Sequence, residues 1–201
     1  MAVTLTHLPL PWEATPSLID YGVDQTAGTG GVQQRATRLG SRYAVGFPAL
    51  PALSFACAKQ LVAARVAAVA SGSTVITSWP QPAFSTAIGA PVVDGAGQGG
   101  GTLNVRGLTP STTALTYGLF FSVVVSRRSY LYMVADGVSV DGTGRAALPL
   151  SPWLRAAPAD GASLSFASPN IEGFITPAGV DWTVERLLWV GLPNFTITEV
   201  A

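Results

Sequence analysis

Fifteen prolines and 22 glycines divide the 201 residues into short segments, and this limits the folds that the chain can adopt. Long helices tolerate such residues poorly, whereas short strands joined by tight turns use them. From residue 73 onward, apolar runs recur about every 8–12 residues between turn residues, a spacing typical of a β-sandwich or a small β-barrel. The predicted strands are "STVITSWPQ" (73–81), "TLNVRGL" (102–108), "YGLFFSVVV" (117–125), "YLYMVADGVSV" (130–140), "GRAALPL" (144–150) and "ASLSFASP" (162–169). The sequence therefore predicts a mainly β protein, with "DGTG" (141–144) as a hairpin turn.

One segment departs from this pattern and favours an α-helix, residues 54–70, "SFACAKQLVAARVAAVA". Its alanines have high helix propensity, Ser54 is a suitable N-cap, and Gly72 is expected to end the helix. Helical spacing predicts a buried stripe formed by Leu61, Val62, Val66 and Val69. The wetter side is predicted at Lys59, Gln60 and Arg65.

The two ends of the chain are predicted to share one structural unit. The segment "DYGVDQTAGTGGVQQRATRLGSRYAVGF" (20–47) predicts a long loop running into a strand, with an exposed glycine-rich tip at 26–31. The C-terminal "DWTVERLLWVGLPNFTITEV" (181–200) predicts two more strands, and its apolar alternation suggests that they complete the N-terminal unit. We therefore predict a β unit of residues 1–89 with the helix, completed by 171–201, and an inserted small barrel or sandwich of residues 90–170.

The chain is poor in charge. Charged residues make up 11% of it, less than half of the roughly 25% found in typical soluble domains, while apolar residues reach 48%. Eleven basic and eleven acidic residues cancel, which argues against nucleic acid or a membrane as a partner. The longest apolar run (119–125) is too short to cross a membrane, and "MAVTLTHLPLPW" lacks the features of a signal peptide. A chain with so many apolar and so few charged residues is expected to bury part of its surface against other subunits.

The stretch Gly95-Ala96-Gly97-Gln98-Gly99-Gly100 has the G-x-G-x-x-G spacing of a dinucleotide-binding turn. Such a turn must be followed by a helix whose N-terminal N–H groups face the pyrophosphate. The residues that follow (102–107) are short and β-prone, so we expect no cofactor here. We interpret the glycines as a flexible junction that leads into the second β unit.

Several motifs occur in a fixed order over residues 30–170. "DGAGQGGGTL" (94–103) is followed by G-x-A-x-L-P-L-x-P-x-L-R (144–155) and by "APADGA" (157–162), and a Gln-Arg…Gly-x-Arg stretch lies upstream at 34–42. This order resembles a family of tail-tip proteins of long-tailed bacteriophages that are related to the distal tail protein. The positions that match are Gln34, Arg35, Gly40, Arg42, Gly95, Gly97, Gln98, Gly99, Gly144, Ala146, Leu148, Pro152, Leu154, Arg155, Pro158, Asp160 and Gly161.

The resemblance implies a virion structural protein assembled in the host bacterial cytoplasm. Such proteins form a ring, often of six subunits, that links the tail tube to the hub and fibre proteins of the tail tip. The sequence departs from the family in its glycine-rich loop tip and in leaving no room for an extra carbohydrate-binding domain. The predicted contacts between subunits or rings are Gly28, Gly30, Gly31, Gln34, Arg35 and Arg42. Arg127 and Arg128 are predicted in a hairpin turn, as solvated residues or partners in an ion pair between subunits, rather than as a nucleic-acid contact.

Residues for catalysis or metal binding are scarce, so we expect neither an enzyme nor a metal site. His7 is the only histidine, no G-x-S-x-G motif occurs, and Cys57, the only cysteine, is predicted in the core. Asp136, Asp141 and Asp160 each precede glycine and are interpreted as turn residues. The alternative function is a carbohydrate-binding β module, which requires that some of the five tryptophans line a surface groove. These are Trp12, Trp79, Trp153, Trp182 and Trp189.

Overall fold

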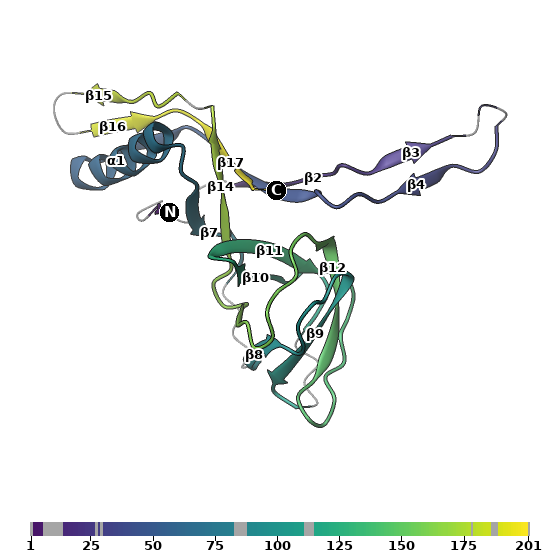
Figure 1. Ribbon diagram of the computed structural model, residues 1–201. Coiled ribbons are helices and arrows are strands. Elements are labelled where there is room, and N and C mark those ends of the chain that lie inside the picture. Colours follow the sequence, from purple (N-terminus) through teal and green to yellow (C-terminus); the bar gives the residue numbers. More distant parts are fainter. Residues whose placement is uncertain are drawn as a thin grey trace.

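The computed structural model describes residues 2–5, 14–26, 28, 30–82, 88–110, 115–177, 179–185 and 189–200 (Figure 1). For residues 50–57, 185, 189–190 and 192 it describes the backbone alone. His7 and Trp12 lie outside the described residues, as do the side chains of Cys57 and Trp189. The described chain is mainly β with one α-helix, which confirms the predicted fold class.

The first sheet takes its strands from both ends of the chain. Its order is β1 (Val3–Thr4), β7 (Val75–Ser78), β14 (Asn170–Thr176), β17 (Phe195–Glu199), β5 (Arg42–Phe47) and β2 (Thr15–Ile19). The C-terminal strand β17 lies between β14 and β5, with Phe174 opposite Thr198 and Ile197 opposite Val45. All pairs are antiparallel except β1 with β7. The last residues of the chain are thus central to this sheet.

The helix α1 (Phe55–Ser71) follows β6 (Leu50–Ser54) directly and ends at Gly72, as predicted. Gly72 has a left-handed φ of 61°, and the N–H of Ser73 donates to the carbonyl of Ala68 at 2.9 Å, a typical helix C-cap. A three-stranded sheet of β15 (Thr183–Glu185), β16 (Trp189–Leu192) and β6 lies at the same end of the molecule (Figure 1). The C-terminal segment therefore contributes three strands rather than the two predicted.

The predicted faces of α1 are partly wrong. Its buried positions are Ala58, Leu61, Arg65 and Ala68, whereas Val66 is 40% exposed. Arg65, which was predicted on the wetter side, is fully buried and its guanidinium carbon lies 4.5 Å from the ring centre of Phe195. The small side chains of Ala58 and Ala68 leave room for this long side chain between helix and sheet. Lys59 and Gln60 are exposed, as predicted.

The second sheet is a nearly closed barrel built from residues 89–165. Its order is β13 (Leu164–Ser165), β10 (Phe120–Val125), β11 (Arg128–Val134), β12 (Ala146–Leu154), β9 (Gly100–Leu108) and β8 (Gly89–Val93). A bridge between Val92 and Ser163 and a hydrogen bond from the N–H of Val93 to the carbonyl of Ala162 draw the two edge strands together. Buried apolar side chains of all six strands fill the interior.

Two predicted turns have structural explanations. Residues 95–99 form the loop between β8 and β9, and the side chain of Gln98 fills it by bonding the backbone of Asp94 and Asn104. A strand follows the glycines, as expected. Asp141 accepts hydrogen bonds from the N–H groups of Thr143 and Arg145, so the turn forms, but residues 135–140 are not a strand and the predicted hairpin is wrong. The polar, glycine-containing run after Val134 leaves the sheet instead.

The segment predicted as a long loop forms an extended hairpin. β3 (Val23–Gln25) and β4 (Gln34–Ala36) pair with each other beyond the ends of β2 and β5. We call residues 20–41 the arm. The prediction failed here because the arm has no buried face, and its strands therefore lack the apolar alternation that marks a half-buried strand.

Candidate assembly surface

The arm projects from the first sheet on the side opposite α1 and beyond the outline of the barrel (Figure 1). From Asp20 to Thr26 the strand advances about 3.3 Å per residue, or roughly 20 Å in all. β3 and β4 form a sheet of two strands, so their outer edges pair with no other described strand. An isolated two-stranded hairpin is marginally stable in water.

The two faces of the arm differ in chemistry. Val23 lies opposite Ala36 and Asp24 lies opposite Arg35, so alternation assigns these pairs to different faces. The first face, on which the same alternation also places the uncharged pair Gln25 and Gln34, continues toward the sheet with Tyr21, which is 45% exposed. On the second, charged face, Arg35 forms ion pairs with both Asp20 and Asp24.

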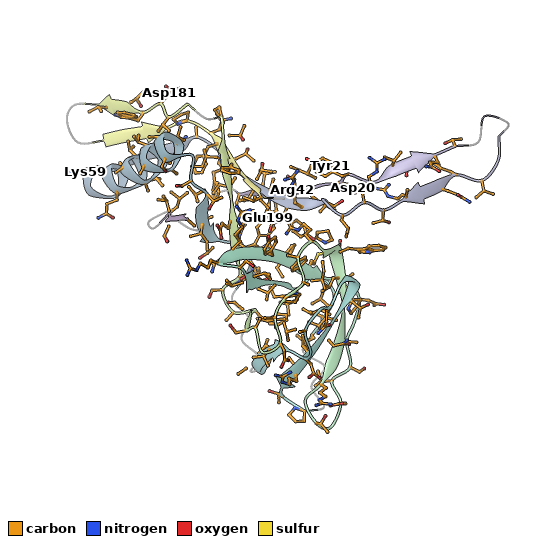
Figure 2. The ribbon with its side chains drawn as sticks, viewed as in Figure 1. Asp20, Tyr21, Arg42, Lys59, Asp181 and Glu199 are labelled. Carbon is orange, nitrogen blue, oxygen red and sulfur yellow. The ribbon has the colours of Figure 1, made fainter. Side chains whose placement is uncertain are left out.

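Six of the eight predicted contact residues lie on the arm or at its root. Gly28, Gly30 and Gly31 are exposed near its tip, and Gln34 is exposed on β4. Arg42 donates to the phenol oxygen of Tyr21 at 2.8 Å and to the carbonyl of Glu199 at 3.4 Å, so it joins the arm to β17 (Figure 2). Arg35 and Arg42 therefore stabilise the arm from within the chain. Whether they also contact another subunit stays a prediction.

A recess lies in the angle between the charged face of the arm and the barrel. Its volume is about 210 Å³, and its walls are Leu18, Asp20, Arg35, Thr37, Arg38, Ser41 and residues 150–153 of β12. Trp153 is 44% exposed at its rim. Sequence reasoning missed this recess, although the alternation along β12, where Leu148, Leu150 and Leu154 are buried, assigns Trp153 to the outer face. We call this feature the arm recess.

Arg127 and Arg128 lie far from the arm in the fold, at the turn between β10 and β11, which confirms the predicted turn. Ser126 and Arg127 have left-handed φ values of 51° and 68°, which costs free energy for residues other than glycine. Both arginines are exposed and line a hollow of about 690 Å³ beside the end of α1. Among the described residues, neither arginine has an ion-pair partner.

The barrel joins the first sheet through a buried ion pair that the sequence did not reveal. Arg155 follows β12, Glu199 ends β17, and their side chains are 4% and 1% exposed with Nη2 and Oε1 2.8 Å apart. The Glu199 carboxylate also accepts the N–H groups of Tyr43 and Leu131, both at 2.8 Å. Burial raises the pKa of Glu199, and the charge of Arg155 opposes that rise.

A second buried carboxylate, Glu172 of β14, repeats this arrangement with neutral donors. It accepts the N–H of Ser129 at 2.8 Å and the hydroxyl of Thr74 at 2.7 Å. β11 pairs with β12 only at Met133 and Val134, so Ser129 and Leu131 lack strand partners on that side. Glu172 and Glu199 satisfy these two N–H groups. Carboxylates of the first sheet thus take the place of a neighbouring strand for the barrel.

Aromatic side chains complete this junction. Tyr43 lies 5.2 Å from Phe120 and 5.6 Å from Trp79, measured between ring centres, and these rings come from both sheets. The Tyr43 hydroxyl donates to the carbonyl of Ser151 in β12 at 3.0 Å, and burial raises its pKa to about 12. The angle between arm and barrel is therefore held by packed rings as well as by charge.

The described residues contain no group of three or more acidic, histidine or cysteine side chains suited to a metal ion. None of their helices has the length and apolar character needed to cross a membrane. Asp160 lies in a turn, and its carboxylate accepts hydrogen bonds from the guanidinium of Arg106 and the N–H of Gly95, which lower its pKa to about 2 and join this turn to β9 and to the loop before it. No protein-family model and no curated protein matches the chain.

Proposed function

We propose that this chain is a virion structural protein, a subunit of a distal tail or baseplate ring that links the tail tube to the tail tip of a long-tailed bacteriophage. The order of motifs over residues 30–170 supports the family, and a ring of about six copies is the expected assembly. In this proposal the chain has no catalytic role. Its partners are its own copies, the tail tube and the hub or fibre proteins, and it requires no cofactor.

The arm is the observation that carries this proposal. Half of the large apolar side chains that the described part exposes lie on the arm and its root or on the adjacent strand β12: Leu18, Tyr21, Val23, Val32, Leu39 and Trp153. A two-stranded hairpin with two open edges gains stability when another surface covers it. A neighbouring copy that packs on the arm would cover both its edges and its apolar residues.

The placement of the arm also fits a ring. A ring of more than two copies uses two different surfaces of each subunit, and each surface of one copy binds the other surface of the next copy. The arm leaves one side of the molecule, while α1 and the β15–β16 pair lie on the other (Figure 1). If the arm of each copy contacts the next copy, every subunit is also contacted by the arm of the previous one. Such a ring closes without leaving an arm free.

The test is the solution mass of the purified protein, followed by negative-stain images of the largest species. The proposal predicts closed rings whose mass is a fixed multiple of 20.7 kDa. A shortened variant, in which Asn-Gly replaces residues 23–36, keeps a two-residue turn between Gly22 and Thr37 and is expected to fold as a monomer. A wild-type protein that stays monomeric at every concentration, alone and with tail-tube protein, would contradict the proposal.

Carbohydrate binding is the second candidate, and the exposure of two tryptophans favours it. Trp153 and Trp182 are 44% and 48% exposed, whereas Trp79 is buried in the junction. An exposed indole can stack on a sugar ring. This candidate predicts a monomer whose tryptophan fluorescence changes in a glycan screen, and no ring.

A further inference from the structure

We infer that the arm recess is the seat of the neighbouring copy of this chain, with Trp153 and Arg38 as its anchoring side chains. This inference rests on the proposed ring function and adds to it the surface on which one subunit holds the next.

The recess is continuous with the arm that carries the proposed ring contact. Leu18, Asp20 and Arg35 form its arm wall, and residues 150–153 of β12 form its barrel wall. A copy that packs against the charged face of the arm therefore meets Trp153 as well. The junction at Glu199 and Tyr43 holds these two walls at one angle, because Tyr43 of β5 bonds to Ser151 on the barrel wall itself.

The side chains at the rim have the chemistry of an interface centre. Trp153 and Leu18 are 44% and 47% exposed, although both are large and apolar. Arg38 also lines the recess and has no hydrogen-bond or ion-pair partner among the described residues. Tryptophan and arginine are the residues most often found at the energetic centre of protein interfaces.

The floor of the recess argues against a small polar ligand. Asp20, the acidic side chain of the recess, already accepts the N–H of Gly22, the hydroxyl of Ser41 and the guanidinium of Arg35, so its carboxylate has little capacity left to bind the hydroxyls of a sugar. The volume of about 210 Å³ is also below the 300–1,000 Å³ usual for small-molecule sites. A shallow recess with a satisfied floor and an apolar and cationic rim suits a protruding part of another subunit.

The experiment compares matched pairs of variants by the concentration at which rings dissociate. Trp153→Ser is paired with Trp182→Ser, which removes an equally exposed tryptophan elsewhere. Arg38→Ala is paired with Arg145→Ala, which removes an exposed arginine of the barrel that does not line the recess and is not a predicted contact residue. Loss of an anchor is expected to weaken association at least about 30-fold, while the control variants stay within about threefold of wild type. Thermal unfolding of each variant shows whether the subunit still folds.

The outcomes separate this inference from the proposed function. If wild type forms rings and both recess variants form them equally well, the recess is not the seat and the ring function stands. If wild type forms no ring, the proposed function fails and the inference with it. If wild type is a monomer and glycans change its fluorescence but not that of Trp153→Ser, the recess is a sugar site and the inference is overturned. Because Trp153 packs over Gly101, Arg38→Ala decides the matter if Trp153→Ser does not fold.

Discussion

Replacing Arg155 by methionine tests whether the buried ion pair holds the barrel to the first sheet. Methionine keeps most of the apolar volume of the arginine stem but removes the charge that faces Glu199 at 2.8 Å. Glu199 is then left as a buried carboxylate with only the N–H groups of Tyr43 and Leu131. Removing one partner of a buried pair costs about 3–5 kcal/mol, and we expect Arg155→Met to lower the free energy of unfolding by that amount near neutral pH.

The pH dependence of this cost follows from the same geometry. The charge of Arg155 opposes the rise that burial causes in the pKa of Glu199, so its removal raises that pKa further. A carboxyl whose native pKa is raised takes up a proton on folding, and its stability contribution is present at low pH and lost as pH rises through the native pKa. The cost of Arg155→Met should therefore shrink as the pH falls toward the ordinary carboxyl value of 4.5.

Urea unfolding, followed by circular dichroism at several pH values, measures both effects. Arg106→Met is the matched control, because Arg106 also pairs with Asp94 and Asp160 but its side chain is 34% exposed. An exposed pair is worth about 1 kcal/mol or less. The double variant Arg155→Met/Glu199→Gln should recover part of the loss, since no unpaired charge stays buried. A loss below about 1 kcal/mol, or one independent of pH, would refute this account of the junction.

Three further predictions follow from single residues. Arg65→Met is expected to raise the free energy of unfolding by about 1–3 kcal/mol, because Nε, Nη1 and Nη2 of Arg65 are buried without hydrogen-bond partners among the described residues. Urea unfolding measures this change, and a loss of stability would contradict the prediction. Gly144→Ala should destabilise the barrel by more than 1 kcal/mol, since φ is 78° and a Cβ would collide with the carbonyl of Leu108. Gly142 lies in open space, so Gly142→Ala should not destabilise it, and thermal unfolding compares the two variants. The pKa of Asp160, about 2 in the native protein, should return toward 3.8 in Arg106→Met, as measured by NMR titration. Because this pKa is lowered on folding, the stabilising contribution of the ionised Asp160 is lost as the pH falls from 3.8 through about 2.

The barrel was predictable because its strands have one buried face. In β12, Leu148, Leu150 and Leu154 point inward at alternate positions, and this pattern is visible in the sequence. The turn at Asp141 was also recognised from local chemistry, since an aspartate before glycine bonds nearby backbone N–H groups. Asp160 lies in a turn too, but the N–H group that it binds belongs to Gly95, 65 positions away, and no local pattern indicates that contact.

The arm and the helix face depended on contacts that a local pattern does not contain. The arm exposes both faces. The alternation of Val23 and Asp24 therefore marks no buried face, and the sequence pattern does not identify the segment as a strand. On α1, the spacing of valines predicted one face, but the buried face is that of Ala58, Ala68 and Arg65, which packs with Phe195 of β17. In both cases tertiary packing, rather than residue type, determined which side chains meet water.

The pair of Arg155 and Glu199 was hidden for a different reason. The two residues lie 44 positions apart and on different sheets, so nothing local indicates that they meet. Arg155 matched a position of the bacteriophage tail-tip family, but a matched position does not say what the side chain touches. The buried partner could be found only from the fold.

The junction and the arm recess are connected by a requirement of ring closure. A ring closes only when every subunit presents its contact surfaces in one fixed geometry, because small errors accumulate around the circle and leave it open. In this chain one wall of the arm recess belongs to the arm, which extends from β5, and the other belongs to β12, so the shape of this contact surface depends on the angle between the two sheets. Arg155, Glu199 and Tyr43 hold that angle with buried hydrogen bonds and a buried charge. In the proposed assembly, this buried, hydrogen-bonded junction is therefore the feature that presents the exposed arm to the neighbouring copy at a defined orientation.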